Sequence, residues 1–298
     1  MKKRFNLVSL AAVIFSLSLF VIISCTKEKS GDGTNAQQET EASQVSSQAD
    51  GEAEIVFNDV FDNAMGASDE VGVAGVGVFG RVTACHTVTV THLTPGVVFP
   101  IRIVIDFGTT GCIGPDGRTR RGKIITEYTG RLMYPGTSAT TTFDGYYVDS
   151  VHVEGTHSIS NVSTVNTQPI VRKFKVDVVN AKLTRPNGNY TKWNSHKTIT
   201  QMEGTTTNLP LDDIFKVEGS ASGQGLRGNL LVGWESVITE PLVKRFNCRW
   251  IVKGKVRTVR VNSNVNSPWV ALLDFGAGTC DNQAVVTING IPHQITLP

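Results

Sequence analysis

Two short motifs contain residue types that nucleotide-dependent enzymes use. Residues 75–82 (GVGVFGRV) match both the glycine-rich loop of protein kinases and the dinucleotide fingerprint, and residues 106–108 (DFG) match the metal-binding triplet of kinases. A kinase also needs a His-Arg-Asp loop, which the sequence lacks, and the two motifs lie too close together for the elements that should separate them. A dinucleotide fingerprint should open a helix, whereas a strand-like stretch, residues 82–90, follows this one. We therefore assign both motifs to β structure.

Residues 152–157 (HVEGTH) contain three side chains that can bind a metal ion. On a strand, His152 and Glu154 share a face, while His157 points to the other face unless Gly155 forms a bulge. Zinc requires three convergent ligands, and the neighbouring sequence supplies no third one. We interpret these residues as the surface of a twisted strand.

Three further polar segments suggest chemistry but lack the pattern that it requires. Asp212 and Asp213 lack the spaced oxygen ligands of a calcium loop, so we expect a solvated turn. Residues 219–223 (GSASG) place Ala rather than Ser at the centre of a nucleophile elbow, so we expect a flexible loop. A basic cluster after a turn could meet anionic lipid or glycan, but we interpret it as a solvated hairpin end. This cluster consists of Arg118, Arg120, Arg121 and Lys123. We predict no catalytic, cofactor-binding or metal-binding residue.

The pattern of apolar residues is that of an all-β protein. Residues 101–105 and 174–178 alternate in the two-residue period of half-buried strands. Asn289-Gly290 between two apolar runs is a strong hairpin signal. Only residues 55–65 have helical spacing of apolar side chains. We expect an antiparallel β-sandwich or a long curled β-meander, with one short N-terminal helix packed on it.

Aromatic residues give a weaker hint of binding. Most large aromatic side chains are expected in the core, but exposed ones on a β scaffold can stack on sugars or contact partner proteins. The six residues in strand-like or turn regions are Tyr128, Tyr134, Tyr146, Tyr147, Trp193 and Trp234.

The sequence also contains an internal repeat. Residues 103–112 (IVIDFGTTGC) resemble residues 271–280 (ALLDFGAGTC), with the same separation between Asp and Cys. Because the second copy repeats the Asp-Phe-Gly triplet, the triplet belongs to the repeated β unit. The pseudo-repeats cover about residues 80–135 and 243–298.

The cysteines follow this repeat. Each copy has an upstream Cys, Cys85 or Cys248, in a strand-like run. Apart from Cys25 the chain has four cysteines, and an even number in an oxidising compartment suggests two disulfides. The simplest arrangement pairs Cys85 with Cys112 and Cys248 with Cys280, and the alternative joins the two copies to each other.

The amino end has the composition of a secretory signal. Residues 2–4 (KKR) are positive, and residues 5–23 are uncharged and largely apolar. About 18 apolar residues can also span a bilayer as an uncleaved anchor. Polar residues dilute this stretch, however, and it ends at Cys25 after the small residue Ser24.

Residues 22–25 (IISC) resemble the cleavage box of bacterial lipoproteins, in which an aliphatic residue, one free position and a small residue precede Cys. The resemblance implies removal of residues 1–24 as a signal peptide. It also implies diacylglycerol and a further acyl chain on Cys25, which would anchor the protein to a membrane. Lipoproteins of gram-negative bacteria without Asp after this Cys usually reach the outer membrane, and Thr26 occupies that position. Beyond the box, the chain resembles in organisation the β-rich envelope lipoproteins of these bacteria.

The mature chain is expected to have a tether and one domain. Residues 25–53 combine the lipidated Cys with a polar segment that has no aromatic residue, which predicts a flexible tether. Residues 54–298 form a single β-rich domain. The formal charge of +2 includes the three positive residues of the signal and becomes −1 without them, so nucleic acid is not a favoured partner.

These observations favour a non-enzymatic binding or structural module, periplasmic or on the cell surface, with a glycan or an envelope protein as partner and no cofactor. The first alternative is a hydrolase of a glycan or another envelope polymer, which needs two carboxylates about 5 to 10 Å apart across a cleft. The second is an accessory subunit of an envelope machine, which needs a large apolar patch or an open strand edge. The hydrolase would draw its carboxylates from Asp144, Asp149, Glu154, Asp212 and Asp213.

Overall fold

The computed structural model describes residues 30–70, 85–114, 116–165, 171–206, 212–261 and 269–298. The signal peptide, Cys25 and the glycine run of residues 75–82 lie outside these ranges. The chain divides into two compact units, residues 1–39 and 40–298. The second unit contains every described strand and the greater part of the one described helix.

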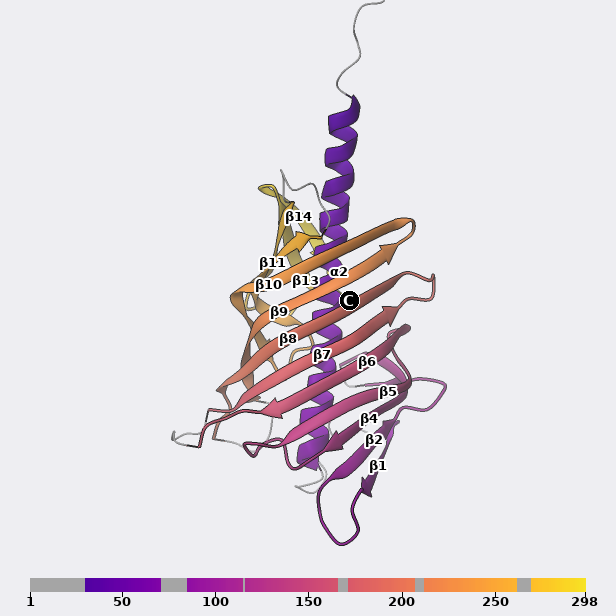
Figure 1. The fold of residues 1–298 in the computed structure, drawn as a ribbon, viewed down its shortest axis with the longest axis vertical. Coiled ribbons are helices and arrows are strands. Elements are labelled where there is room, and N and C mark those ends of the chain that lie inside the picture. Colours follow the sequence, from indigo (N-terminus) through magenta and orange to yellow (C-terminus); the bar gives the residue numbers. More distant parts are fainter. Residues whose placement is uncertain (1–29, 71–84, 115, 166–170, 207–211, 262–268) are drawn as a thin grey trace, which may run out of the picture. The chain divides into compact units, whose positions relative to one another are not determined.

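The strands form one antiparallel 14-stranded sheet in which almost every strand pairs with its neighbours in sequence (Figure 1). The order is β1-β2-β4 and then β5 to β14 in turn, and the short β3 pairs only with β4. The prediction of an antiparallel all-β fold is confirmed, and the sheet is the long meander rather than the sandwich. The strands are β1 (Thr87–His92), β2 (Ile101–Asp106), β3 (Cys112–Ile113), β4 (Thr119–Tyr128), β5 (Ser138–Val148), β6 (Val151–Asn161), β7 (Lys173–Thr184), β8 (Tyr190–Glu203), β9 (Ile214–Arg227), β10 (Leu230–Arg245), β11 (Ile251–Arg260), β12 (Val270–Ala277), β13 (Gln283–Ile288) and β14 (Ile291–Thr296).

Each strand separates an inner face from an outer face, because successive side chains point to opposite sides of a sheet. On β2, Ile101, Ile103 and Ile105 are buried and Arg102 is exposed, as the two-residue period predicts. The inner face is therefore apolar, and a buried element must cover it.

That element is the helix α2 (Ser30–Glu70), which is much longer than the short helix predicted for residues 55–65. No residue from Ala42 to Gly66 is fully exposed. The prediction of a flexible tether up to residue 53 is therefore wrong from Ser30 onward. Composition favoured a tether because the segment is too polar to fold alone, whereas contacts with the sheet now provide the free energy that orders it.

Small side chains let the helix lie close to the strands. A Cβ atom added to Gly51 would lie 3.0 Å from Leu273 of β12 and 3.3 Å from Leu297 near the carboxyl end. A side chain at this position would therefore require the leucines or the helix to shift. The buried small residues of α2 also include Ala42, Ser43, Ser46, Ser47, Ala49 and Ala53.

Further along the helix, large side chains fill a wider space. Phe61 packs edge to face against Phe174 of β7 and Phe215 of β9, with ring centroids 5.8 Å apart in both cases. Tyr128 of β4 donates a hydrogen bond to the backbone oxygen of Ala64 (2.8 Å). The helix therefore contacts both halves of the sheet.

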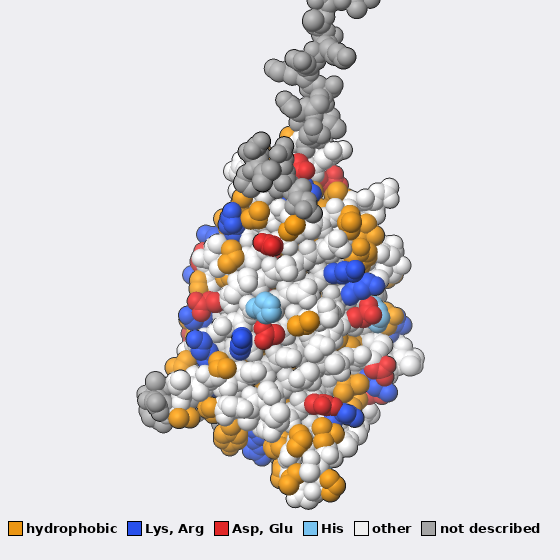
Figure 2. All heavy atoms as spheres, in the orientation of Figure 1, with side chains coloured by type: hydrophobic (Ala, Val, Ile, Leu, Met, Phe, Trp, Pro, Cys, Tyr) orange, Lys and Arg blue, Asp and Glu red, His pale blue; other side chains and the backbone are white. Residues whose placement is uncertain are grey.

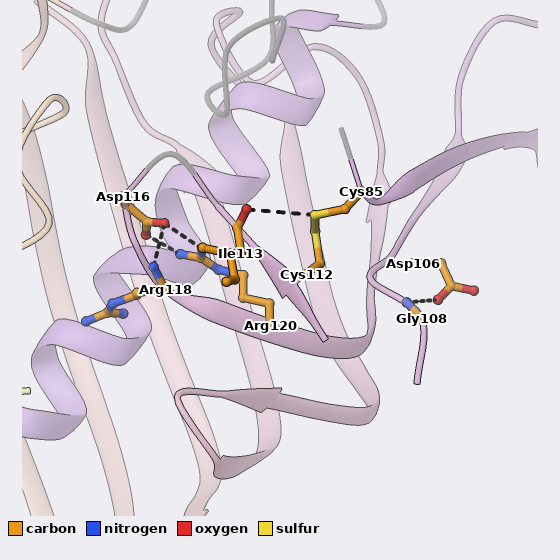
Figure 3. The surroundings of a disulfide bond; sticks show 8 residues. All are labelled: Cys85, Asp106, Gly108, Cys112, Ile113, Asp116, Arg118 and Arg120. Atoms are coloured by element: carbon orange, nitrogen blue, oxygen red, sulfur yellow. Dashed lines mark hydrogen bonds and ion pairs between the residues drawn. A yellow bond between two sulfur atoms is a disulfide. The ribbon is translucent and has the colours of Figure 1, made fainter. Parts of the chain in front are cut away.

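Both predicted disulfides are present. Cys85 pairs with Cys112 (Figure 3), and Cys248 pairs with Cys280, with Cα–Cα distances of 5.5 and 5.9 Å. The first bond joins the residues before and after the hairpin β1–β2, and the second does the same for β11–β12. The sequence repeat is thus a β-hairpin closed by a disulfide, present twice.

The repeated Asp-Phe-Gly triplet ends the second strand of each hairpin. Asp106 accepts a hydrogen bond from the backbone N–H of Gly108, and Asp274 accepts one from Gly276, both at 2.9 Å. This two-residue bond to the backbone is a common way for Asp to form a turn. The triplet has a structural role here, as the repeat predicted.

A proline in the buried part of α2 tests the corrected role of this segment. We expect Ala49→Pro to destabilise the protein by about 3 kcal/mol or more, because proline removes a helical hydrogen bond and clashes with the preceding turn. Gln37→Pro is the control: it interrupts the same helix at an exposed position outside the unit of residues 40–298, so it should change the melting temperature little. Thermal unfolding followed by circular dichroism measures both, and equal melting temperatures for Ala49→Pro and the natural chain would contradict a buried helix.

Candidate functional site

Acidic residues of α2 face indole and basic groups on the inner face of the sheet. Asp50 accepts hydrogen bonds from Trp193 Nε1 (2.8 Å) on β8 and from Trp234 Nε1 (3.0 Å) on β10. Between the two indoles, Gly223 of β9 has no side chain, and a Cβ atom there would lie only 2.3 Å from the ring of Trp234. The row Trp193, Gly223 and Trp234 therefore positions two buried donors on one carboxylate.

Four more acidic residues of the helix form ion pairs with the sheet. Each pair joins residues far apart in sequence, and most of the side chains are nearly inaccessible to solvent. The pairs are Glu52 with Arg185 and Arg227, Glu54 with Lys197, Asp59 with Arg120, and Asp62 with Lys244. This buried network fixes how the helix sits in the sheet, so it is structural rather than an open site.

The basic cluster after the first turn is not a solvated hairpin end. Arg118 and Arg120 are buried. Arg120 contacts Asp116 (Figure 3) and also Asp59 of α2, each at 2.6 Å. Strand alternation on β4 places Arg121 on the outer face, where its guanidinium lies 3.8 Å from the ring centre of Tyr147. The prediction failed because the partner Asp59 comes from the helix.

Two other polar predictions are corrected in the same way. Asp213 lies buried and accepts a hydrogen bond from Gln201 Nε2 (2.7 Å), so only Asp212 of this pair is exposed. Residues 219–223 form part of β9 instead of a flexible loop. The glycines mislead because their role is packing: a Cβ atom on Gly219 would lie 2.2 Å from the backbone oxygen of His196.

The interpretation of these β6 residues as the surface of a strand holds for His152 and Glu154, but it is wrong for His157, which the inner face buries. His152 lies 3.6 Å from Glu154, and His157 is fully buried on the inner face, nearly parallel to the ring of Phe57. Burial lowers the pKa of His157 to about 3, so its imidazole is neutral. In the described part of the chain, no three His, Cys, Asp or Glu side chains come together to hold a metal ion.

Most of the aromatic candidates belong to the core. Tyr128, Tyr146, Trp193 and Trp234 are buried. Tyr134, which is 60% exposed, lies in the turn after β4 and is the aromatic residue best placed for contact with a partner.

The outer face carries a hollow lined by many polar groups. Two adjoining depressions of about 580 and 570 Å³ cross β8, β9, β10 and β11 and share Asn194, Ser222 and Glu235. We call them the outer groove. Its floor is low because Ser220, Ser222 and Gly233 carry small side chains or none. Longer residues rise around this floor, among them Lys192, His196, Gln224, Arg257 and Arg260.

The outer groove contains one arrangement that suggests catalysis. Asp177, His196 and Ser220 are direct cross-strand neighbours on β7, β8 and β9, and His196 Nδ1 lies 2.7 Å from Asp177 Oδ1. Ser220 forms no hydrogen bond with His196 in the described structure, and the surrounding backbone N–H groups belong to the sheet ladder. The Ser220 hydroxyl therefore has no base bonded to it, and in the described strands around it no unpaired N–H group is available to bind an oxyanion. The row of Asp177, His196 and Ser220 lacks these two parts of a nucleophilic site.

The carboxylates proposed for a hydrolase have separate partners. Asp144 lies near Lys123, Asp149 near Arg118, and Glu154 near His152 and Lys182. Asp213 is buried elsewhere, against Gln201. The described contacts thus bring none of these carboxylates together.

Comparisons with protein-family models, curated proteins and solved structures found no match for this chain. Within the described residues, no helix has the length and apolar character needed to span a bilayer. The function of this chain must therefore be inferred from its own geometry.

Replacing the buried histidine should change the acid sensitivity of the protein. The pKa of His157 is about 3 in the folded state and about 6.5 when unfolded. The contribution of this neutral histidine to the free energy of unfolding is therefore fully present above pH 6.5 and is lost as the pH falls toward 3. This loss has a limit of about 1.4 kcal/mol per pH unit. His157→Leu should reduce it.

Urea unfolding between pH 7 and pH 4 measures this difference. The matched control is His152→Leu, at a half-buried position on the same strand. An unchanged dependence of stability on pH in His157→Leu would show that the histidine is not buried and neutral.

Proposed function

We propose that this protein is a lipid-anchored, non-enzymatic binding module of the outer membrane, which holds a glycan of the cell envelope in the outer groove. The observation that supports the proposal is the outer groove itself, an open depression on the sheet that combines polar groups with the exposed side chains of Leu231, Val237 and Val261. Its floor and sides are strand residues, so a ligand would meet a preformed surface.

The dimensions and chemistry of the outer groove suit an extended polar ligand. Four neighbouring strands span about 14 Å, from three inter-strand spacings of about 4.8 Å. Amide, hydroxyl, carboxylate and guanidinium groups alternate along it, which gives hydrogen-bond donors and acceptors for sugar hydroxyl and acetamido groups. Arg257, Arg260 and Lys192 outnumber Glu235 among its charged residues, which favours a glycan that carries anionic groups.

The anchor rests on the cleavage box of residues 22–25. Helix α2 begins at Ser30, five residues beyond the expected lipidated Cys25. Only a short segment would then separate the lipid from the start of the helix. An anchored receptor of this kind would search for immobile envelope polymers close to its own membrane.

Loss of the anchor cysteine should release the protein from the membrane. We expect Cys25→Ser to abolish lipid attachment and signal cleavage before residue 25, because the box requires the thiol. Mass spectrometry of the amino-terminal peptide and fractionation of membranes measure both effects. An unmodified Cys25 in the natural protein would refute the anchor. Protease treatment of intact cells is a separate measurement, and it shows which side of the membrane the domain faces.

Filling the outer groove should remove binding without unfolding the sheet. A Cβ atom on Gly233 meets only ordinary contacts, at 3.8 Å from Gly223 O and from Val261 Cβ, so Gly233→Phe can project its ring into the groove. We expect at least a tenfold loss of affinity, about 1.4 kcal/mol, and a change in stability within about 0.5 kcal/mol.

Co-sedimentation with purified peptidoglycan and with lipopolysaccharide measures this loss. Thr142→Phe, at an exposed position on β5, is the matched control and should bind normally. Binding that Gly233→Phe leaves unchanged would exclude the groove, and binding to neither polymer would exclude a glycan receptor of this type.

A further inference from the structure

Among the residues that the structure describes, the first strand lies at an unpaired edge of the sheet. Within the described residues, β1 pairs with β2 alone, and all six of its residues are exposed. Figure 2, which shows the outer face of the sheet, has hydrophobic side chains at its lower end, where Figure 1 places the hairpin of β1 and β2. Val88 and Val90 are each about 40% exposed, at 41% and 40%. Residues 85–101 contain no Asp, Glu, Lys or Arg.

The register shows which backbone groups face outward. Leu93 N donates to Pro100 O (2.9 Å), and in an antiparallel ladder the residues that bond the neighbouring strand alternate with those that do not. Thr87, Thr89 and Thr91 therefore direct their backbone groups to β2. Val88 and Val90 direct theirs to the free edge, where a further strand can bind.

The internal repeat provides a direct precedent for a strand at this edge. The hairpin β1–β2 corresponds to β11–β12, since each is closed by a disulfide and ends in the same Asp turn. In the second copy, β11 has β10 on its other side. The same position beside β1 has no strand within the described structure.

The opposite edge of the sheet is protected. Strand β14 contains Pro292, which lacks an N–H group and interrupts the donors of an exposed edge. Natural sheets commonly use proline or charge to prevent edge pairing, and β1 contains neither. The difference indicates that β1 is an edge for association.

We infer that β1 pairs antiparallel with β1 of a second copy of this chain, centred on Thr89. Residues 87–91 (TVTVT) read the same in both directions, so this pairing places threonine opposite threonine and valine opposite valine. Such pairs of β-branched residues stabilise sheets, and no like charges meet. Val88 of one copy and Val90 of the other form about four backbone hydrogen bonds across the two-fold axis.

Side-chain burial favours the same partner. Val88 and Val90 lie on the inner face, opposite the buried Ile105 and Ile103 of β2. In the dimer, four valines join into one apolar cluster that continues the core across the interface. This assembly is additional to the proposed glycan binding, because β1 is far in sheet order from the outer groove on β8 to β11.

Photocrosslinking of the full chain in cells tests the inference. A benzophenone amino acid replaces Thr89, and two differently tagged copies are expressed together. We expect a crosslinked band that contains both tags at twice the mass of one chain. A benzophenone at Thr142, exposed on β5, is the control position and should give no such band.

A second experiment introduces a charge at the edge of β1. Val90→Lys places two ammonium groups close to the axis and should reduce the crosslinked fraction about fivefold or more. Val179→Lys on the central strand β7, where the valine is 44% exposed, is matched in residue type and exposure and should have no effect. Unchanged circular dichroism and melting would show that Val90→Lys is folded.

Three results would overturn the inference. The first is the absence of a two-tag band, and the second is crosslinking of Thr89 only to a different protein. The third is a dimer band that folded Val90→Lys leaves unchanged. Glycan binding by Gly233→Phe is measured in a separate experiment, so the proposed dimer and the proposed glycan binding can be refuted independently.

Discussion

The contact between α2 and the inner face of the sheet is the interaction on which the rest of the fold depends. The helix supplies carboxylates, and the sheet supplies indole, guanidinium and ammonium groups at matching positions. Such buried pairs add little net stability, because desolvation offsets much of their attraction. Removal of one partner is costly, however, since it leaves an uncompensated charge in the interior. The network therefore determines the position and rotation of the helix more than it increases the free energy of unfolding.

This packing determines where the protein can bind other molecules. The side chains of the inner face are committed to the helix from β4 through β12, as the contacts of Arg120, Trp193 and Leu273 show. Ligands must then bind the outer face or the ends of the meander. The outer groove and the edge of β1 are such places, and each uses a different property of the sheet. The groove uses the side chains that point away from the helix, and the edge uses backbone groups.

Two buried titrating groups give the core opposite responses to pH. Burial lowers the pKa of His157, so acid destabilises the fold through this residue. Burial raises the pKa of Asp62 to about 7 despite its contact with Lys244, so ionisation of this carboxyl between about pH 4 and 7 opposes folding. The two dependences overlap and partly cancel, and comparison of single variants separates them.

The sequence by itself determined the features that are local. Period-two alternation specified strands such as β2, and the Asp-Phe-Gly repeat indicated two equivalent units. The cysteines of the repeat made the observed disulfides the simplest pairing, with a pairing between the two copies as the alternative. These features depend on residues a few tens of positions apart at most, so their pattern is visible along the chain. The export signal and the lipid anchor at Cys25 are also inferences from local sequence, and they stay predictions.

Only the tertiary structure decided the features that depend on distant partners. Residues 42–53 belong to a segment with the composition of a linker, and they are helical because the sheet, formed by residues much later in the chain, covers them. Arg120 and Asp213 carry charges that favour solvent, and they are buried because Asp59 and Gln201 neutralise or bind them. The glycines of residues 219–223 suggest a loop, but they lie in a strand because Trp234 and the backbone of His196 occupy the space of their side chains. In each case the deciding energy is a contact that composition and spacing do not contain.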